Sequence, residues 1–420
     1  MYALIDGNCF YASCQRIFRP DLAHKAIVVL SNNDGCVVTR TREAKALGIK
    51  MAVPFFQIAH LERAGLLTVF SSNYELYADV SARMMASIAS LVPQVEVYSI
   101  DECFADLAGM PDELTTLGHQ IRARVAQWVG IPTCVGIAPT KTLAKFCNHL
   151  AKRHDRLGGV LNWQDLNPER QAKALASEPV GEVWGIGRQT ADKLGRMGIL
   201  TALDLARADP ATIRARFGVV VERTQRELQG IACLKLEDAA PAKQQLVRSR
   251  SFGGLIHDQA ELAAAIAHHV AEAAADLRAQ GSVAAMLGVE LHTHRFHEQT
   301  PQHHALEWTA LPVPCNDTLA LTREAQRLLE RLYRPGFGYK KAGVLLSGIE
   351  TGPARQLDLL AEAVSPTREA LLATLDTINT RYGRGTLRLA AEGLGQQWHM
   401  RRDRVSPCYT TCFADLPRVG

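Results

Sequence analysis

The sequence predicts an α/β protein of several domains, and three observations lead to this prediction. The chain has 420 residues, more than one ordinary hydrophobic core accommodates, so we expect two to four domains. Strand-like and helix-like segments alternate over residues 1–165, as in a sheet covered by helices. Between residues 245 and 347 the order is strand, helix, strand, strand, helix, strand, which is the ferredoxin-like βαββαβ unit.

The first domain opens with a short apolar strand at residues 2–5 that ends at Asp6, and a helical segment starts near Phe10. Further strands are expected at residues 26–30, 95–100, 103–107 and 133–138, and helices at residues 41–47, 77–91 and 117–129. Gly48 is suited to stop the helix before it. Thr140 is suited to cap the helix that follows the last strand.

A smaller helical unit is expected at residues 166–240. The glycine-bounded turn at residues 183–187 and the helix at 189–197 form a helix-hairpin-helix pattern. Such a turn exposes backbone N–H groups at a helix N-terminus, where a phosphate can bind. Arg188 and Lys193 add positive charge there.

The ferredoxin-like unit occupies residues 241–350, after a linker at 238–243. We expect strands at residues 245–252, 283–293, 305–311 and 340–347 and helices at 259–279 and 317–332. Arg248 and Arg250 alternate on its first strand and could contact phosphates. After Gly348 the chain becomes polar and rich in turn-forming residues, so residues 351–420 are expected to form a tail.

Composition excludes several classes of protein. The apolar fraction is 47% and the formal charge is +4, which are ordinary values for a globular protein. The 10 cysteines contain no Cys-x-x-Cys pair, and no signal peptide is evident, so we expect reduced thiols in a cytoplasmic protein. No apolar run is long enough to span a bilayer.

The sequence Ser99-Ile100-Asp101-Glu102 lies between two apolar strands, where a tight connection normally carries glycine or asparagine. One reading is a solvated turn. The other is a metal site, because paired carboxylates suit hard divalent cations such as Mg²⁺. Asp6 at the end of the first strand supplies a third carboxylate. Three carboxylates brought together on a sheet can hold two Mg²⁺ ions about 3.5–4 Å apart for phosphoryl transfer.

Several longer motifs add to these residues. Residues 6–14 (DGNCFYASC) and residues 99–102 (SIDE) resemble the first and the second motif of the Y-family (translesion) DNA polymerases. Residues 30–38 (LSNNDGCVV), 71–79 (SSNYELYAD) and 183–188 (VWGIGR) more closely resemble the UmuC type of that family, the catalytic subunit of DNA polymerase V. The resemblance extends to residues 406–411 (SPCYTT).

The resemblance implies a right-hand polymerase: a palm at 1–165 with small fingers inserted at about 11–76, a helix-hairpin-helix thumb, a little finger and a C-terminal partner-binding tail. The implied substrates are primer-template DNA and deoxynucleoside triphosphates, with two Mg²⁺ ions as cofactor.

The resemblance also implies roles for individual residues. The catalytic and metal-binding residues are Asp6, Gly7 (by its carbonyl), Asp101 and Glu102; the steric gate against ribose is Tyr11; the nucleotide contacts are Phe10, Tyr11, Thr39, Lys45 and Lys152; and the DNA contacts are Gly185, Gly187, Arg188, Arg248 and Arg250.

Two positions depart from the family pattern. Cys9 stands where many relatives carry tyrosine, which puts a triphosphate contact there in doubt. Cys103 follows the Asp-Glu pair where alanine is common, and we expect only packing from it.

The UmuC-type resemblance further implies error-prone translesion synthesis in the bacterial SOS response, at the nucleoid. The implied partners are a cleaved UmuD-type subunit, RecA recombinase and the sliding β-clamp. Residues 356–360 (QLDLL) resemble a clamp-binding motif, with Gln356, Leu357, Leu359 and Leu360 as its anchors. The alternative for this stretch is an ordinary tail helix.

Two other functions remain open from the residues themselves. One is a DNA-binding scaffold that recruits repair partners and has little or no catalytic activity. The other is a two-metal nuclease, which the predicted nucleotide contacts disfavour. Mg²⁺-dependent primer extension separates the polymerase from both.

Overall fold

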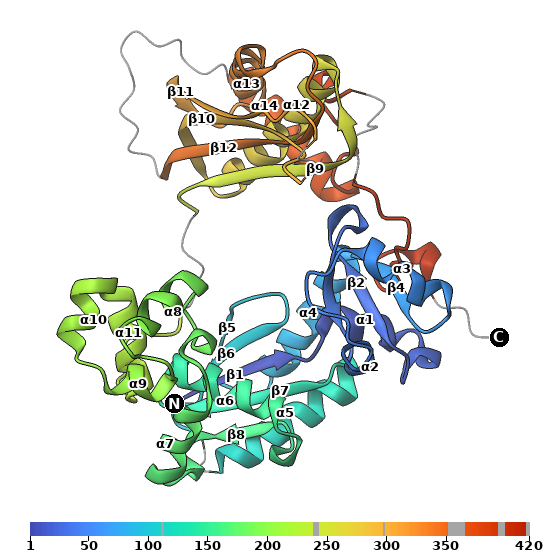
Figure 1. Cartoon of the computed structure of the whole chain (residues 1–420). Helices are drawn as coiled ribbons and strands as arrows, with labels where there is room; N and C mark the ends of the chain where they lie inside the picture. Colours follow the sequence, from blue (N-terminus) through green and yellow to red (C-terminus); the bar gives the residue numbers. More distant parts are fainter. Residues whose placement is uncertain (111–112, 238–242, 297–298, 352–365, 394–399, 417–420) are drawn as a thin grey trace. The chain divides into compact units, whose positions relative to one another are not determined.

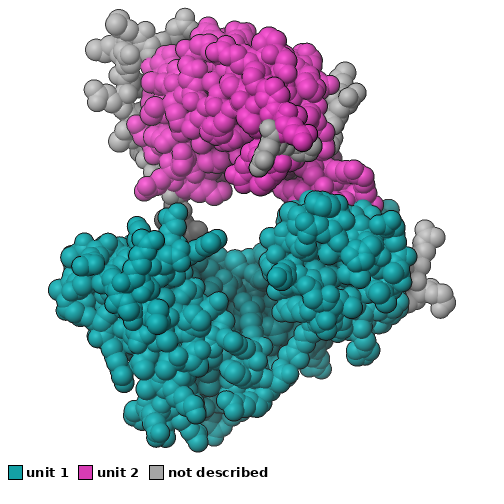
Figure 2. Space-filling model, in the orientation of Figure 1, with its two compact units in different colours: residues 1–31, 35–240, 404–420 teal, residues 32–34, 241–403 magenta. Residues whose placement is uncertain are grey.

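The computed structural model describes residues 1–110, 113–237, 243–296, 299–351, 366–393 and 400–416, which form two compact units (Figures 1 and 2). Unit 1 comprises Met1–Ser31, Gly35–Ala240 and Arg404–Gly420, and unit 2 comprises Asn32–Asp34 and Pro241–Asp403. The predicted palm and thumb thus fall almost wholly in unit 1 and the predicted little finger in unit 2. The predicted tail contributes to both units. The exact boundaries of the palm, the thumb, the little finger and the tail remain predictions.

Unit 1 is built on a five-stranded sheet with the order β5-β6-β1-β7-β8. Its strands are β1 (Tyr2–Gly7), β5 (Gln94–Val97), β6 (Glu102–Asp106), β7 (Thr133–Ala138) and β8 (Val160–Asn162). The central strand β1 is antiparallel to both of its neighbours, β6 and β7. The ends of these three strands are therefore held in a fixed register.

Helices cover both faces of this sheet, so successive residues of β1 enter different cores. The helices are α1 (Phe10–Ile17), α4 (Tyr74–Ala89), α5 (Leu114–Val129) and α6 (Lys141–Arg153). Ala3 and Ile5 share one hydrophobic cluster with α1, α4 and α5. Leu4 and Phe104 share another with α6. Because side chains alternate along a strand, Asp6 lies on the face of Leu4, toward α6.

The segment between α1 and α4 forms a second, smaller sheet with the order β3-β2-β4. Its elements are β2 (Ile27–Leu30), β3 (Val37–Arg40), α2 (Arg42–Ala46), α3 (Phe55–Arg63) and β4 (Thr68–Ser71). β2 is antiparallel to β3 and parallel to β4. This insert has a small hydrophobic cluster of its own around Val28, Leu30 and Val69. We call it the fingers.

Five helices continue the chain through the predicted thumb. They are α7 (Pro168–Ser177), α8 (Arg188–Gly195), α9 (Ala202–Arg207), α10 (Pro210–Phe217) and α11 (Val219–Leu228). α8 begins directly after the turn that contains Gly185 and Gly187, which confirms the predicted helix to within two residues. Gly185 has φ +86°, a conformation that favours glycine.

Unit 2 contains an antiparallel sheet with the order β11-β10-β12-β9, packed against two helices. The elements are β9 (Leu246–Ile256), α12 (Gln259–Ala279), β10 (Ser282–Thr293), β11 (His304–Cys315), α13 (Thr318–Leu332) and β12 (Tyr339–Thr351). Their order confirms the predicted βαββαβ unit. Across the described ranges, no helix has both the length and the apolar character that crossing a membrane requires.

A further helix, α14 (Pro366–Tyr382), lies in the region where the sequence predicts only a polar tail. Arg278 of α12 binds Asp376 of α14 with two hydrogen bonds of 2.6 and 2.8 Å. Arg368 also lies 3.2 Å from Asp317. Leu372 is the one residue of α14 that is fully buried. Charge pairs rather than an apolar stripe therefore attach this helix, which is why hydrophobic periodicity missed it.

α6 approaches the central sheet closely at Gly136 of β7. A Cβ atom there would lie 2.1 Å from the carbonyl oxygen of Ala144 and 2.2 Å from the amide nitrogen of Asn148. The side chain of Asn148 donates hydrogen bonds to the carbonyl oxygens of Leu4 and Cys134, at 3.3 and 2.8 Å. The backbone of α6 thus rests directly on the sheet, held by an amide that reaches two strands.

We predict that Gly136→Ala destabilises unit 1 by about 2–3 kcal/mol, because the methyl group would force helix and strand apart. Urea unfolding followed by circular dichroism measures the change. Gly181→Ala is the matched control, since a Cβ there meets only the Ala191 methyl group at 3.4 Å. An unfolding midpoint equal to that of the parent would show that the contact is not tight.

Candidate active site

Asp101 and Glu102 lie at the corner of the β5–β6 hairpin, as the sequence predicts. The N–H groups of Tyr98 and Ser99 both donate to the carbonyl oxygen of Glu102, at 3.1 and 3.0 Å. The Ser99 hydroxyl donates to Asp101 Oδ1 at 2.7 Å and accepts the N–H of Glu102 at 3.2 Å. The corner is therefore fixed by its own hydrogen bonds, and Ser99 orients the Asp101 carboxylate.

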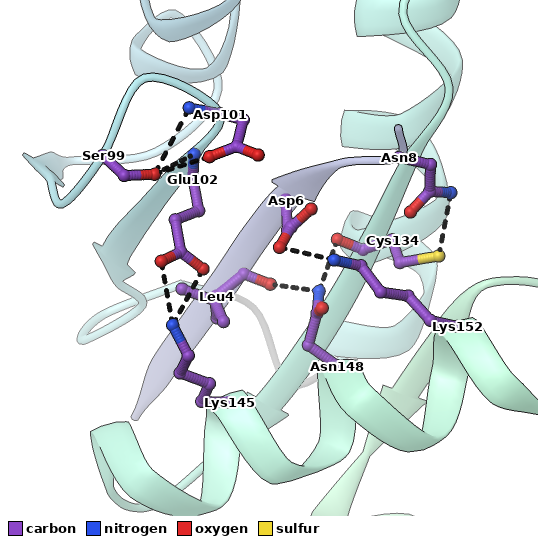
Figure 3. A network of polar contacts seen from close by, with 10 residues as sticks. All are labelled: Leu4, Asp6, Asn8, Ser99, Asp101, Glu102, Cys134, Lys145, Asn148 and Lys152. Carbon is purple, nitrogen blue, oxygen red and sulfur yellow. Dashed lines mark hydrogen bonds and ion pairs between the residues drawn. The ribbon is translucent and has the colours of Figure 1, made fainter. Parts of the chain in front are cut away.

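Asp6 adjoins this corner across the sheet. Asp6 of β1 is the direct cross-strand partner of Glu102 of β6, and the N–H of Gly7 donates to the Asp101 carbonyl oxygen at 2.7 Å. Figure 3 shows the three acidic side chains around the ends of these two strands. The structure thus brings together Asp6, Asp101 and Glu102, which lie far apart in the sequence.

Two lysines of α6 neutralise two of these carboxylates (Figure 3). Lys152 Nζ lies 2.5 Å from Asp6 Oδ2, and Lys145 Nζ lies 2.8 and 3.0 Å from the two Glu102 oxygens. The structure directs Lys145 into the site, against the Glu102 carboxylate. Lys141, Lys145 and Lys152 share one helical face, since they are four and seven residues apart. This spacing is the feature of the sequence that indicates a shared face for the three lysines.

The acidic residues offer oxygen ligands for a divalent cation. Among the residues that the structure describes, no group of three His, Cys, Asp or Glu side chains is placed to hold a metal ion. Asp6 and Asp101 nevertheless line the same cavity. Two carboxylates at one place, with Glu102 next in the chain, are a donor set that fits Mg²⁺ better than softer metals.

The environment of Asp6 raises the pKa of its carboxyl group well above the usual value. Burial raises the pKa of Asp6 to about 6, Lys152 opposes this rise, and the Asp101 and Glu102 carboxylates add to it. The cause is that a buried negative charge loses its hydration. A cation at this site would compete with a proton as well as with Lys152.

A cavity of about 700 Å³ extends from these carboxylates to the fingers. Its wall includes Phe10, Thr39, Lys45 and Lys152, four of the five predicted nucleotide contacts. The cationic residues of the wall are Arg16, Arg40, Arg42, Lys45, Arg122 and Lys152, and the acidic ones are Asp6, Glu43, Asp101 and Asp155. Positive charge therefore exceeds negative charge around the cavity, as a polyanionic ligand requires.

Arg16, Arg40, Arg42 and Arg122 were not predicted, because single arginines in the sequence give no signal of a shared cavity. Arg42 of α2 forms two hydrogen bonds to Asp155, at 2.6 and 3.3 Å, which link the fingers to the segment after α6. Arg16 pairs with Glu43 at 2.9 Å. Lys45 has no ion-pair partner within the described part of the chain.

Tyr11, the predicted steric gate, follows the cavity-lining Phe10 in the chain but is not part of the cavity wall. Its ring stacks on Tyr77, with centroids 4.3 Å apart and an angle of 13° between the planes. Tyr77 is fully buried, and its hydroxyl accepts a hydrogen bond from Gln15 at 3.0 Å. Tyr74 packs edge-on against Tyr11 at 6.2 Å. The Tyr11 ring is therefore held in place from two sides.

The other predicted contacts lie outside the cavity. Gly185, Gly187 and Arg188 are exposed at the start of α8. In unit 2, Arg248 and Arg250 lie on the helix-covered side of β9, and Arg248 pairs with Asp276 of α12. The predicted clamp-binding residues Gln356, Leu357, Leu359 and Leu360 lie outside the described residues.

Comparison with known proteins gives the family. Residues 5–149 match the impB/mucB/samB family, and residues 243–359 match the C-terminal domain of that family. The chain is 43% identical to the protein ImpB of Salmonella typhimurium and 43% identical to the protein UmuC of the same species, over the whole of each chain. The chain belongs to the impB/mucB/samB family.

This chain shares the fold of Y-family DNA polymerases. A chimera of the Y-family polymerases Dbh and Dpo4 matches 84% of this chain with a TM-score of 0.65 at 20% identity, and 99% of the chimera is covered. A ternary complex of Dbh DNA polymerase matches with a TM-score of 0.53. DNA polymerase IV of Oceanobacillus iheyensis is 28% identical over 90% of this chain and 88% of its own. The predicted Y-family, UmuC-type polymerase is confirmed at the level of family, fold and enzyme class.

One matched region of this family member has no assigned role. Residues 369–419 match a domain of unknown function. This region includes most of α14 and the C-terminal segment that belongs to unit 1.

We predict that Mg²⁺ binding to the free protein depends on pH through Asp6. Because the pKa of Asp6 is about 6, the carboxyl group carries a proton below that pH, which a cation has to displace. The apparent affinity for Mg²⁺ should fall about tenfold per pH unit below pH 6 and level off above it. Calorimetric titration at a series of pH values measures this. Asp6→Asn should bind weakly and without the slope, and a slope that persists in this variant would assign it to another group.

Proposed function

We propose that this protein is a template-directed, Mg²⁺-dependent DNA polymerase that carries out error-prone translesion synthesis. The observation that best supports the proposal is the composition of the cavity wall. Acidic residues of the central sheet, Asp6 and Asp101, lie at one part of it, and cationic residues of the fingers such as Lys45 lie at another. A deoxynucleoside triphosphate needs both, a metal site for its reacting phosphate and positive charge for the rest.

The residues of the cavity would divide the work. Asp6 and Asp101, with Glu102 and the Gly7 carbonyl, would hold two Mg²⁺ ions, which activate the primer hydroxyl and neutralise the charge that develops on the triphosphate. Lys45 and Lys152 would bind phosphate oxygens, and Thr39 would orient them by a hydrogen bond. Positioning and charge then carry the reaction, without a covalent enzyme intermediate.

Tyr11 would act as the steric gate. Its ring is fixed by Tyr77 and Tyr74, so it cannot move aside for a bulkier sugar. Phe10, its neighbour, is almost wholly buried and lines the cavity. A fixed ring beside the nucleotide excludes a 2′-hydroxyl by its volume alone.

The DNA contacts are proposed at the thumb and little finger. Gly185 and Gly187 leave the backbone N–H groups before α8 accessible, and a Cβ at Gly187 would meet nothing within 4 Å. Such groups bind phosphates without regard to sequence. Arg188 is exposed beside them. Arg248 and Arg250 are proposed to contribute from unit 2, where Arg248 would first have to leave Asp276.

The full-length similarity to the protein UmuC supports the biological setting. We propose that the polymerase acts in the bacterial SOS response to DNA damage, in the cytoplasm and at the nucleoid. Its proposed partners are a cleaved UmuD-type subunit, RecA recombinase and the sliding β-clamp, with the clamp bound at Gln356–Leu360. A DNA-binding scaffold without activity is the alternative that primer extension would reveal.

We predict that Asp101→Ala lowers nucleotide incorporation by at least about a hundredfold, since a lost metal ligand removes several kcal/mol of transition-state stabilisation. Binding of primer-template should stay nearly unchanged, because the phosphate contacts are elsewhere. Primer extension and fluorescence anisotropy measure the two properties. Asp106→Ala on the same strand is the matched control. Substantial extension by purified Asp101→Ala would refute the metal role.

We predict that Tyr11→Ala improves the incorporation of ribonucleotides relative to deoxynucleotides by roughly 10–200-fold, the range for one small group in a tight pocket. The cause is the space that the missing ring leaves beside the sugar. Single-nucleotide extension with each substrate measures the ratio. Tyr382→Ala, a change at an exposed tyrosine of α14, should leave the ratio as in the parent. The gate assignment fails if Tyr11→Ala discriminates as the parent does.

A further inference from the structure

The C-terminal segment of residues 404–416, which we call the brace, returns to unit 1. All the residues between Pro241 and Asp403 belong to unit 2, whereas the chain from Arg404 onward belongs to unit 1. In Figure 1 the brace is the red segment beside α3 and β4. It lies within the region that matches a domain of unknown function.

The fingers join the rest of unit 1 at two chain crossings. The chain leaves α1 after Ile17 and enters the fingers, and it returns at Asn73, which caps α4. The fingers have a core of only nine buried apolar side chains, and small units of this kind have little stability of their own. The position of the fingers therefore depends on what holds these two crossings, together with direct contacts such as that of Arg42 with Asp155.

The brace binds the return crossing through buried hydrogen bonds. The N–H of Ser71 donates to the carbonyl oxygen of Arg404 at 3.0 Å, and the N–H of Arg404 donates to the Ser71 hydroxyl at 2.9 Å. The side-chain amide of Asn73 donates to the carbonyl and hydroxyl oxygens of Ser406, at 2.9 and 3.1 Å. Ser71 and Asn73 are completely buried. The oxygen of the same Asn73 amide accepts the N–H of Leu76, so one side chain links α4 to the brace.

The brace binds the outgoing crossing through an aromatic stack. The rings of Tyr409 and Phe18 lie 4.6 Å apart with 18° between their planes. Phe18 is the first residue after α1. Both rings pack against the hydrophobic cluster of the central sheet. This end of the brace is therefore attached to the palm.

The other end of the brace is attached to the fingers. The guanidinium of Arg404 binds both carboxylate oxygens of Glu62 on α3, at 2.9 and 3.1 Å. It also lies over the ring of Phe55, 4.6 Å from the centroid. Phe55 packs against the small core of the fingers. A half-buried arginine with a two-pronged ion pair and a ring contact fixes an orientation that lysine could not reproduce.

The fingers in turn supply one wall of the nucleotide cavity. Thr39 of β3, Arg42 of α2 and Lys45 of α2 line it. In the sheet order β3-β2-β4, the edge strand β3 lines the cavity. The brace binds the opposite edge strand, β4, and the helix α3. The brace can therefore affect a bound triphosphate by setting the position of the fingers, without touching the ligand.

We propose that the brace fixes the fingers to the palm at both crossings and so sets the position of the triphosphate-binding wall. Arg404, Tyr409 and Asn73 are positioning residues for the incoming nucleotide. This role gives a function to the last part of the region of residues 369–419. The inference rests on the proposed polymerase function, because it concerns the nucleotide cavity of that enzyme.

The test uses the full-length chain with Arg404→Ala and, separately, Tyr409→Ala in single-nucleotide primer extension. We expect each change to raise the KM for the incoming deoxynucleotide roughly tenfold, as for a misplaced substrate contact. kcat should stay within about twofold and primer-template affinity should be unchanged, because the metal ligands and DNA contacts do not move. Tyr409→Phe keeps the ring stack and should retain the parent KM. Arg401→Ala removes an exposed arginine just before the brace and is the charge control.

Hydrogen exchange gives a second readout that does not need activity. Amides of β2 and β4 should exchange faster in Arg404→Ala than in the parent, with those of β1 and β7 unchanged. Glu62→Gln, a milder change from the opposite side of the ion pair, should reproduce this effect if Arg404→Ala does not fold. An unchanged KM together with unchanged hydrogen exchange in these variants would overturn the role proposed for the brace. Faster exchange in a protein whose parent extends no primer would support the brace and refute the polymerase function.

Discussion

The candidate active site depends on the absence of a side chain at Gly136. Because α6 rests on the backbone of β7 at that point, its lysines reach the ends of β1 and β6 rather than the solvent. Asn148 secures the contact with hydrogen bonds to two strands. The placement of Lys145 and Lys152 over Glu102 and Asp6 is therefore a result of backbone packing, one layer away from the chemistry.

This packing offsets most of the negative charge of the site. Three carboxylates close together on a sheet would repel one another, and burial would oppose their ionisation. Lys152 and Lys145 oppose both effects by direct ion pairs with Asp6 and Glu102, although burial still raises the pKa of Asp6. Under the proposed function, a cation bound by the acids would release these lysines, and Lys152 would then be available to the phosphates of a nucleotide in the same cavity. The same side chains would thus stabilise the free protein first and the bound substrate afterwards.

Much of the fold could be predicted from the sequence, because its signals are local. Each of three signals is visible within a short stretch of sequence. They are the alternation of strands and helices, the carboxylates in place of turn residues at 101 and 102, and the βαββαβ order. Family motifs added the roles of the residues. The second sheet of the fingers was missed in part because its strands have only four residues each. The arginines of the cavity were missed because their meeting depends on contacts between distant segments, such as Arg42 with Asp155, 113 positions apart. The contact of Asn73 with Ser406 spans 333 positions and has no local pattern.

The return of the chain to unit 1 affects the order in which the molecule can be completed during its synthesis. Domains generally fold as they emerge from the ribosome, beginning at the N-terminus. Unit 1 cannot follow this rule fully, since its last segment is translated only after the 163 residues from Pro241 to Asp403 of unit 2. Until then the buried amide of Asn73 and the hydroxyl of Ser71 lack their partners in the brace. A nascent chain can therefore complete the contacts between the brace and the fingers only after all of unit 2 has been made.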